Sequence, residues 1–294
     1  GHGGARRPAV LYGLVTGGFI SLYTVWDGYA VGHAGAVPLV YMVVSEGWRA
    51  LLMLPVALRG RAEVARVWRA HRGATVDVAL LSEELDGFLA RIADGDFFAR
   101  EVPQESRKLV DVAFSGNGEP TSSPEFPAAV AAVRKVLAAR GLAGTVLLRL
   151  ITNGSLLHRN KVQAAIRDLG SSGGEVWFKV DRVGAADAAA VNGVPLDPGR
   201  VLANLRRCGN LAPTWVQTCW FAFDGAAPDA AARQAYCELI AQAADCVRGV
   251  HLYGLARSSQ QPAAPRLARL DVGDLEAFAA EIEMKTGVRT LVSP

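Results

Sequence analysis

One short loop places a carboxylate between residues that control its backbone. Gly116, Asn117, Gly118, Glu119 and Pro120 follow an apolar run of strand type. Glycines lack a Cβ atom, so a ligand can approach the backbone closely, and proline restricts the preceding glutamate to extended conformations. A carboxylate held at a strand end is suited to bind an ammonium group through a charge-assisted hydrogen bond. The same pattern also fits an ordinary turn with a solvated glutamate.

Further polar residues follow, or lie near the ends of, four later apolar runs. They are Asn153; Lys179 and Asp181; Gln217 and Thr218; and His251, Tyr253 and Arg257. The carboxyl ends of parallel strands meet at one edge, so this placement predicts a polar pocket there. Other interpretations stay open: turn chemistry for Asn153, a local ion pair between Lys179 and Asp181, interior packing for Gln217 and Thr218, and a hydrogen-bonded core histidine for His251.

The elements that must position these residues alternate along the chain from Thr75 onward. The expected strands cover 109–115, 145–151, 175–180, 215–221, 249–253 and 289–292, and the expected helices cover 82–94, 124–140, 161–169, 198–207, 228–244 and 275–285. Ser123 is the expected N-cap of the second helix, with Pro124 at its first position. Strands and helices that alternate with this spacing predict an α/β fold with a parallel sheet, open or closed into a barrel.

Four motifs resemble those of radical S-adenosylmethionine (SAM) enzymes, in that family's order. They are FSGNGEPTSSPEF (114–126), LITNGSLL (150–157), VWFKVDR (176–182) and GVHLYGLAR (249–257). The resemblance implies that residues 74–294 form a partial (β/α)6 barrel that lacks its first strand. It also implies SAM as cofactor, with Gly118 and Glu119 binding the SAM amino group inside a loop shaped by Asn117.

The resemblance assigns the remaining candidates by their strands. Asn153, Lys179 and Asp181 would line the SAM or substrate side, and His251, Tyr253 and Arg257 would flank the adenine or the substrate. The substrate itself is not identified by any motif.

The family's [4Fe–4S] cluster has no ligands in the expected place. Thiolates hold iron in such clusters, and the family uses C-x3-C-x2-C after its first strand. The four cysteines here are Cys208, Cys219, Cys237 and Cys246, all after the glycine–glutamate loop, and their spacings predict buried thiols. The sequence therefore predicts a radical SAM relative that is inactive as written. The alternatives are a non-catalytic SAM-binding or scaffold domain, and a partner chain that completes the barrel and the cluster.

The first 73 residues have a different character. Residues 9–31 and 37–58 are apolar runs long enough to cross a bilayer, and arginines flank both ends, which predicts a transmembrane hairpin with the βα domain on the cytoplasmic side. LVTGGFISLYTVWD and PLVYMVVSEGWRALLMLPVAL also resemble helices of EamA-type drug/metabolite transporters. The alternatives are two buried helices of a soluble protein, in which Glu46 and Arg49 pair on one face, and a transporter fragment fused to an unrelated tail.

Composition excludes little. The chain is 51% hydrophobic over 294 residues, and its net charge of +3 gives no signal for nucleic-acid binding.

Overall fold

A computed structural model of the chain describes residues 76–115, 118–184, 188–189, 191, 195–255 and 264–293. The chain divides into two units, Gly1–Arg72 and Gly73–Pro294, and every described residue belongs to the second. The predicted apolar hairpin at 9–58 lies outside the described residues. Within the described ranges, no helix has the length and apolar character needed to span a bilayer.

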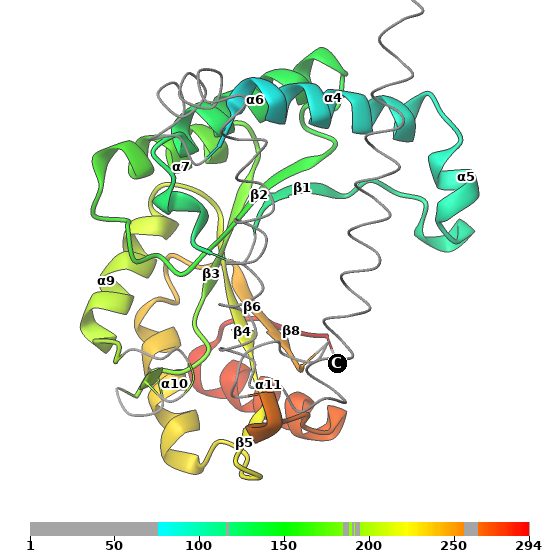
Figure 1. Cartoon of the computed structure of the whole chain (residues 1–294). Helices are drawn as coiled ribbons and strands as arrows, with labels where there is room; N and C mark the ends of the chain where they lie inside the picture. Colours follow the sequence, from blue (N-terminus) through cyan, green and yellow to red (C-terminus); the bar gives the residue numbers. More distant parts are fainter. Residues whose placement is uncertain are drawn as a thin grey trace, which may run out of the picture. The chain divides into compact units, whose positions relative to one another are not determined.

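Six parallel strands form the main sheet, in the order β1-β2-β3-β4-β6-β8. They are β1 Asp111–Phe114, β2 Leu147–Thr152, β3 Glu175–Lys179, β4 Thr214–Cys219, β6 Gly249–Tyr253 and β8 Thr290–Ser293. Every neighbouring pair is parallel, which confirms the predicted parallel α/β sheet. Spatial order follows chain order (Figure 1). Because every pair is parallel, all six carboxyl ends lie at the same edge of the sheet.

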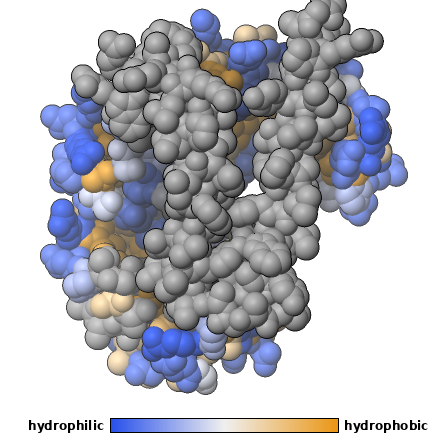
Figure 2. Space-filling view, in the orientation of Figure 1, coloured by the Kyte–Doolittle hydropathy of each residue, from blue (hydrophilic) through white to orange (hydrophobic). Residues whose placement is uncertain are grey.

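Seven helices are described, and three of them begin at an aspartate whose side chain accepts a free backbone N–H. The seven helices are α4 Val78–Ala93, α5 Phe97–Glu101, α6 Phe126–Ala139, α7 Asn160–Ser171, α9 Pro198–Gly209, α10 Ala230–Gln242 and α11 Val272–Thr286. Asp77, Asp197 and Asp229 each accept a backbone N–H of the first turn of α4, α9 and α10. α5 was not expected, and it is hydrophilic toward its outer edge (Figure 2).

The predicted start of α6 was wrong by two residues. The helix begins at Phe126 with Glu125 as N-cap residue, not at Pro124 after Ser123. Ser123 Oγ accepts the Glu125 N–H at 3.3 Å, which forms a local turn through Pro124. The Ser123 hydroxyl is therefore part of this turn and is not the cap of the helix. A serine side chain that accepts the backbone N–H two residues later competes with helix formation.

The core lies on one face of the sheet. Alternate side chains such as Leu150, Val176 and Val250 are fully buried there, against helix residues such as Ile166 and Leu205. α7, α9 and α10 run along this side (Figure 1). Side chains on the other face of β2, β3, β4 and β6 are half-buried or exposed. The two faces therefore differ as expected for a strand period of two.

A second, antiparallel sheet was not predicted. β5 (Ala222–Phe223) pairs with β7 (Leu267–Ala268). Asp224 has a φ of 52° and forms an ion pair with Arg266 at 2.5 Å. Strands of two residues carry too little alternation to be seen in a sequence.

Candidate functional site

Glu119 is fixed by four hydrogen bonds at the end of β1. Its Oε1 accepts the Thr121 N–H at 3.2 Å and the Thr121 hydroxyl at 2.6 Å. The Thr152 hydroxyl donates to the same oxygen at 2.6 Å, and Oε2 accepts the Asn153 N–H at 2.8 Å. The carboxylate thus joins its own 3-10 turn, Pro120–Ser122, to the end of β2. Its position is therefore set by its own turn and by the end of the neighbouring strand β2.

The hydrogen bonds leave Glu119 one defined acceptor site. An ionised carboxylate has about four lone-pair positions. Oε1 already receives three donors, whereas Oε2 receives one. Oε2 can therefore accept a further charge-assisted hydrogen bond from a ligand cation without losing an internal one.

The turn after β2 depends on Gly154. The Gly154 N–H donates to Thr152 Oγ1 at 3.0 Å, so the threonine proton is directed to Glu119. Gly154 has a φ of 71°, and a Cβ atom there would lie 2.2 Å from the Phe178 ring. The Thr-Asn-Gly sequence is thus turn chemistry, as the sequence allowed, and it also positions the carboxylate.

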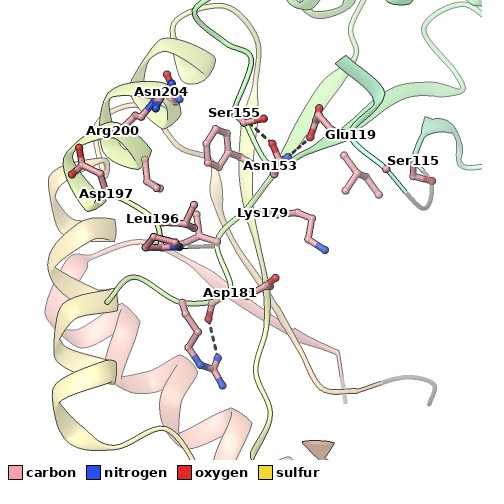
Figure 3. A pocket seen from close by; sticks show the side chains of 17 residues that line it. Ser115, Glu119, Asn153, Ser155, Lys179, Asp181, Leu196, Asp197, Arg200 and Asn204 are labelled. Carbon is pink, nitrogen blue, oxygen red and sulfur yellow. Dashed lines mark hydrogen bonds between the residues drawn. The ribbon is translucent and has the colours of Figure 1, made fainter. Parts of the chain in front are cut away.

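A cavity of about 830 Å³ opens beside Glu119 at the carboxyl ends of β1, β2 and β3. The predicted residues Gly118, Glu119, Asn153, Lys179 and Asp181 all line it (Figure 3). These five residues come from three separate stretches of sequence, and the fold places them around one cavity. Pro120 instead lines an adjoining, more apolar hollow of about 520 Å³, while Gly116 and Asn117 lie outside the described residues.

Lys179 and Asp181 supply opposite charges at the end of β3. The Cys219 N–H donates to Asp181 Oδ1 at 2.8 Å. Burial raises the pKa of the Asp181 carboxyl, although the Lys179 charge and the Cys219 N–H act in the opposite direction. The described side chains include no Lys179–Asp181 ion pair within 4.0 Å, and Lys179 is exposed toward the cavity. The local ion pair that the sequence allowed is therefore not formed.

The start of α9 contributes residues that sequence reasoning missed. Asp197, Arg200 and Asn204 line the cavity opposite β3 (Figure 3). Their signal was present, because Asp197-Pro198 marks the start of a helix after a strand. In such folds the helices begin at the edge where the preceding strands end, so residues near the start of α9 face the cavity.

His251 and Tyr253 do not line the cavity. Both lie on the half-buried face of β6, and His251 stacks between Trp177 and Trp215 with ring centroids 4.4 and 4.5 Å away. Burial lowers the pKa of His251; the nearby Glu175 charge acts against this shift, whereas the charges of Arg149 and Arg289 act in the same direction as burial. It is not the hydrogen-bonded core histidine considered from the sequence. Arg257 lies outside the described residues.

An unpredicted row of charges and rings crosses this half-buried face. Arg149 pairs with Asp111 and, at 2.7 Å, with Glu175, and so joins β1, β2 and β3. Its guanidinium lies 4.0 Å from the Trp177 ring centre, and Arg289 lies 5.1 Å from that of Trp215. These cation–π contacts stabilise the half-buried face of the sheet.

The four cysteines do not fit a [4Fe–4S] cluster. Cys208 and Cys237 are buried, whereas Cys219 and Cys246 are half-buried, which corrects the prediction of four buried thiols. Burial raises the pKa of Cys208 to about 12 and that of Cys219 to about 11, which favours thiol over thiolate. In the part of the chain that the structure describes, no three His, Cys, Asp or Glu side chains gather as metal ligands.

No family model matches this chain, and no curated protein matches it. Among solved structures, a domain of pyruvate-formate lyase-activating enzyme from Bacteroides vulgatus ATCC 8482 is similar over 63% of this chain and 99% of that one, at 14% identity and a TM-score of 0.46. A radical SAM methyltransferase from Sphaerobacter thermophilus is similar over 70% of this chain, at 17% identity and a TM-score of 0.49. The match spans 56% of the methyltransferase chain.

Proposed function

We propose that residues 74–294 bind SAM in the manner of a radical SAM enzyme but do not cleave it. The observation that carries this proposal is the Glu119 carboxylate, held by four hydrogen bonds with one acceptor position of Oε2 left over. That geometry suits a primary ammonium group such as the SAM amine. The motif order in the sequence supports the same ligand.

The cavity beside Glu119 has the volume and polarity for such a ligand. Its 830 Å³ falls in the range of about 300–1,000 Å³ that small-molecule sites occupy. Carboxylates from Glu119 and Asp181 and the ammonium of Lys179 line it. SAM carries an ammonium, a carboxylate and ribose hydroxyls. The carboxylates of the cavity can bind the ammonium and the hydroxyls, and the Lys179 ammonium can bind the carboxylate.

The inactive state follows from the ligand chemistry of iron. A [4Fe–4S] cluster would supply the electron that splits SAM, and it needs three grouped thiolates. The four cysteines here all follow Glu119 in sequence, and two of them are buried in the core. The chain's own contribution is thus to bind and orient SAM.

Calorimetry with S-adenosylhomocysteine tests the binding site, because this analogue keeps the amino group and needs no cluster. We expect Glu119→Gln to weaken its binding about 10–100-fold, the value of a charge-assisted hydrogen bond. Glu125→Gln is the matched control, since Glu125 stands in the same segment but does not line the cavity. Equal affinity of the wild type and Glu119→Gln, or no binding by the wild type, would exclude the proposed site.

Anaerobic reconstitution with iron and sulfide tests inactivity. We expect no stoichiometric iron, no broad absorbance near the 400 nm region typical of such clusters, and no 5′-deoxyadenosine from SAM. Production of 5′-deoxyadenosine by the purified chain alone would refute the inactive state. Production only after a second protein is added would show that the partner chain supplies the cluster in trans.

We further propose that residues 9–58 tether this domain to a membrane, with the βα domain on the cytoplasmic side. The support is the length of the two apolar runs and their flanking arginines. The full chain should sediment with membranes and resist carbonate extraction. Complete release by carbonate would contradict the tether and favour the alternative of two buried helices.

A further inference from the structure

Three cationic side chains among the described residues line the cavity beside Glu119, and one of them is unpaired. Arg182 donates to two backbone carbonyls at 2.8 Å each and is part of the wall. Lys179 is the proposed partner of the SAM carboxylate. No described residue forms an ion pair or a hydrogen bond with the Arg200 guanidinium, which is exposed to solvent. Because SAM has a single carboxylate, Arg200 is left for a second ligand.

Asn204 lies one helical turn after Arg200 and offers a directed donor. Asn204 is only 7% exposed, and its Oδ1 accepts a hydrogen bond from Arg207 Nη1 at 2.9 Å. This bond identifies the oxygen side of the amide, so Nδ2 is the end left for another partner. Nδ2 donates to no described residue, yet it is not enclosed, since Gln217 Oε1 is the one enclosed side-chain N or O atom that lacks a partner in the described ranges. Asn204 therefore presents a free N–H donor to the cavity that it lines (Figure 3).

The helix places these two donors on one face. Residues four apart on a helix such as α9 have Cβ atoms about 5–6 Å apart on the same side. The guanidinium fork matches the two oxygens of a carboxylate, and an amide N–H beside it can donate to one of them. Pro195, Leu196 and Val201 supply apolar surface around the pair. Two donors next to an apolar wall suit an acid whose body is apolar.

We infer that Arg200 and Asn204 bind the carboxylate of a second ligand, a small carboxylic acid with an apolar body, beside SAM. That this acid is a ligand distinct from the cofactor rests on the proposed binding of SAM at Glu119. Asp197 stands three residues before Arg200 and lines the same cavity, so its negative charge favours a carboxylate monoanion over a phosphate dianion.

Ligand-detected NMR tests this subsite with benzoate and its uncharged isostere benzamide as probes. The wild type should bind benzoate at least about fivefold more tightly than benzamide, and phenyl phosphate less tightly than benzoate. Arg200→Met should weaken benzoate binding by about fivefold or more, because the bidentate pair is lost, and should leave benzamide binding unchanged. Equal binding of benzoate and benzamide by the wild type, or tighter binding of phenyl phosphate, would overturn the inference.

Asn204→Asp tests the second donor. The variant keeps an acceptor for Arg207 but replaces Nδ2 with a carboxylate oxygen, so benzoate binding should again weaken by about fivefold or more. Arg206→Met is the matched control, because Arg206 belongs to the same helix but donates to the Gln242 carbonyl at 3.0 Å and does not line the cavity. Equal losses in Arg206→Met and Arg200→Met, or no loss in Asn204→Asp, would refute the subsite. Arg200 is exposed, so its variant remains a test where Asn204→Asp does not fold.

Two cross-tests separate this inference from the proposed function. Benzoate should bind Lys179→Met as it binds the wild type, and S-adenosylhomocysteine should bind Arg200→Met as it binds the wild type. Loss of S-adenosylhomocysteine binding in Arg200→Met, or loss of benzoate binding in Lys179→Met, would place the carboxylate in the cofactor site and refute the second ligand. If the wild type fails to bind S-adenosylhomocysteine but binds benzoate through Arg200, the proposed function fails while the subsite stands.

Discussion

At the residue scale, the environment of Glu119 explains why a short loop can hold a ligand group accurately. Thr121 comes from its own turn, whereas Thr152 and Asn153 come from the end of the neighbouring strand. Each donor alone is a common local contact. Together they prevent rotation of the carboxylate, because any other orientation would leave buried hydroxyl donors unpaired.

Gly154 gives the first test at this scale. Gly154→Ala combines a left-handed backbone with a Cβ atom 2.2 Å from Phe178, so we expect it to destabilise the fold by about 2–4 kcal/mol. Gly173→Ala is the control, since Gly173 has a φ of 82° with nothing within 4 Å of its Cβ position, and it should cost only about 1 kcal/mol. Urea denaturation measures both. Similar values for the two variants would show that Phe178 does not constrain the turn.

His251 gives a pH-dependent test. Its folded-state pKa is lowered below the ordinary value near 6.5, so the unfolded chain binds the proton more readily. The stability that depends on neutral His251 is therefore fully present above pH 6.5 and is lost as pH falls through that value toward the folded pKa. His251→Phe should reduce the loss of stability between pH 7.5 and 5.0 in urea denaturation, whereas His158→Phe, at an exposed position, should not. Parallel pH profiles for wild type and His251→Phe would contradict this assignment.

At the element scale, three strands are held by one arginine. Arg149 on β2 contacts Asp111 on β1 and Glu175 on β3, and Glu175 also accepts the Trp177 indole N–H at 2.9 Å. Parallel strands that come from distant parts of the chain gain register from such side-chain ties as well as from the ladder. The contacts of Arg149 therefore help to align β1, β2 and β3, and the ends of these three strands line the cavity.

Removal of this arginine should be costly. The Arg149 and Glu175 side chains are 12% and 16% exposed, so Arg149→Met leaves two poorly solvated carboxylates, and we expect a loss of about 2–4 kcal/mol. Arg100→Met is the control, because its pair with Asp96 is 68% and 72% exposed and should contribute about 0–1 kcal/mol. Chemical denaturation of both variants gives the comparison. A loss of less than about 1 kcal/mol in the free energy of unfolding of Arg149→Met would contradict the role of Arg149 in holding the three strands together.

At the scale of the whole molecule, the thiols report how the domain is packed. Burial raises the pKa of Cys219 to about 11, so its alkylation by iodoacetamide should speed up nearly tenfold for each pH unit from 8 to 10. Cys208 has no exposed surface and should react only on unfolding. Mass spectrometry of peptides alkylated with and without urea distinguishes the four sites. Fast labelling of Cys208 in the native chain would show a looser core than described.

The sequence determined the six parallel strands and, within a few residues, the helices that follow them. Apolar runs and cap residues such as Asp197 and Asp229 are local signals, because each can be recognised from residues that are close in sequence. The same locality explains the errors. The start of α6 depended on whether the Ser123 side chain capped the helix or formed the turn before it. α5, β5 and β7 are too short to show a periodic pattern of apolar residues.

Only the tertiary structure decided which polar residues share a site. Glu119, Asn153, Lys179 and Asp181 meet because consecutive strands end at one edge, and this much followed from the sequence and the order of its strands. The separation of His251 from that cavity, its stacking between Trp177 and Trp215, and the unpaired oxygen of Gln217 depend on register between strands far apart in the chain. Register sets the height of each side chain along the strand, and it is fixed when the buried faces of neighbouring strands pack together, not by residues that are close in sequence.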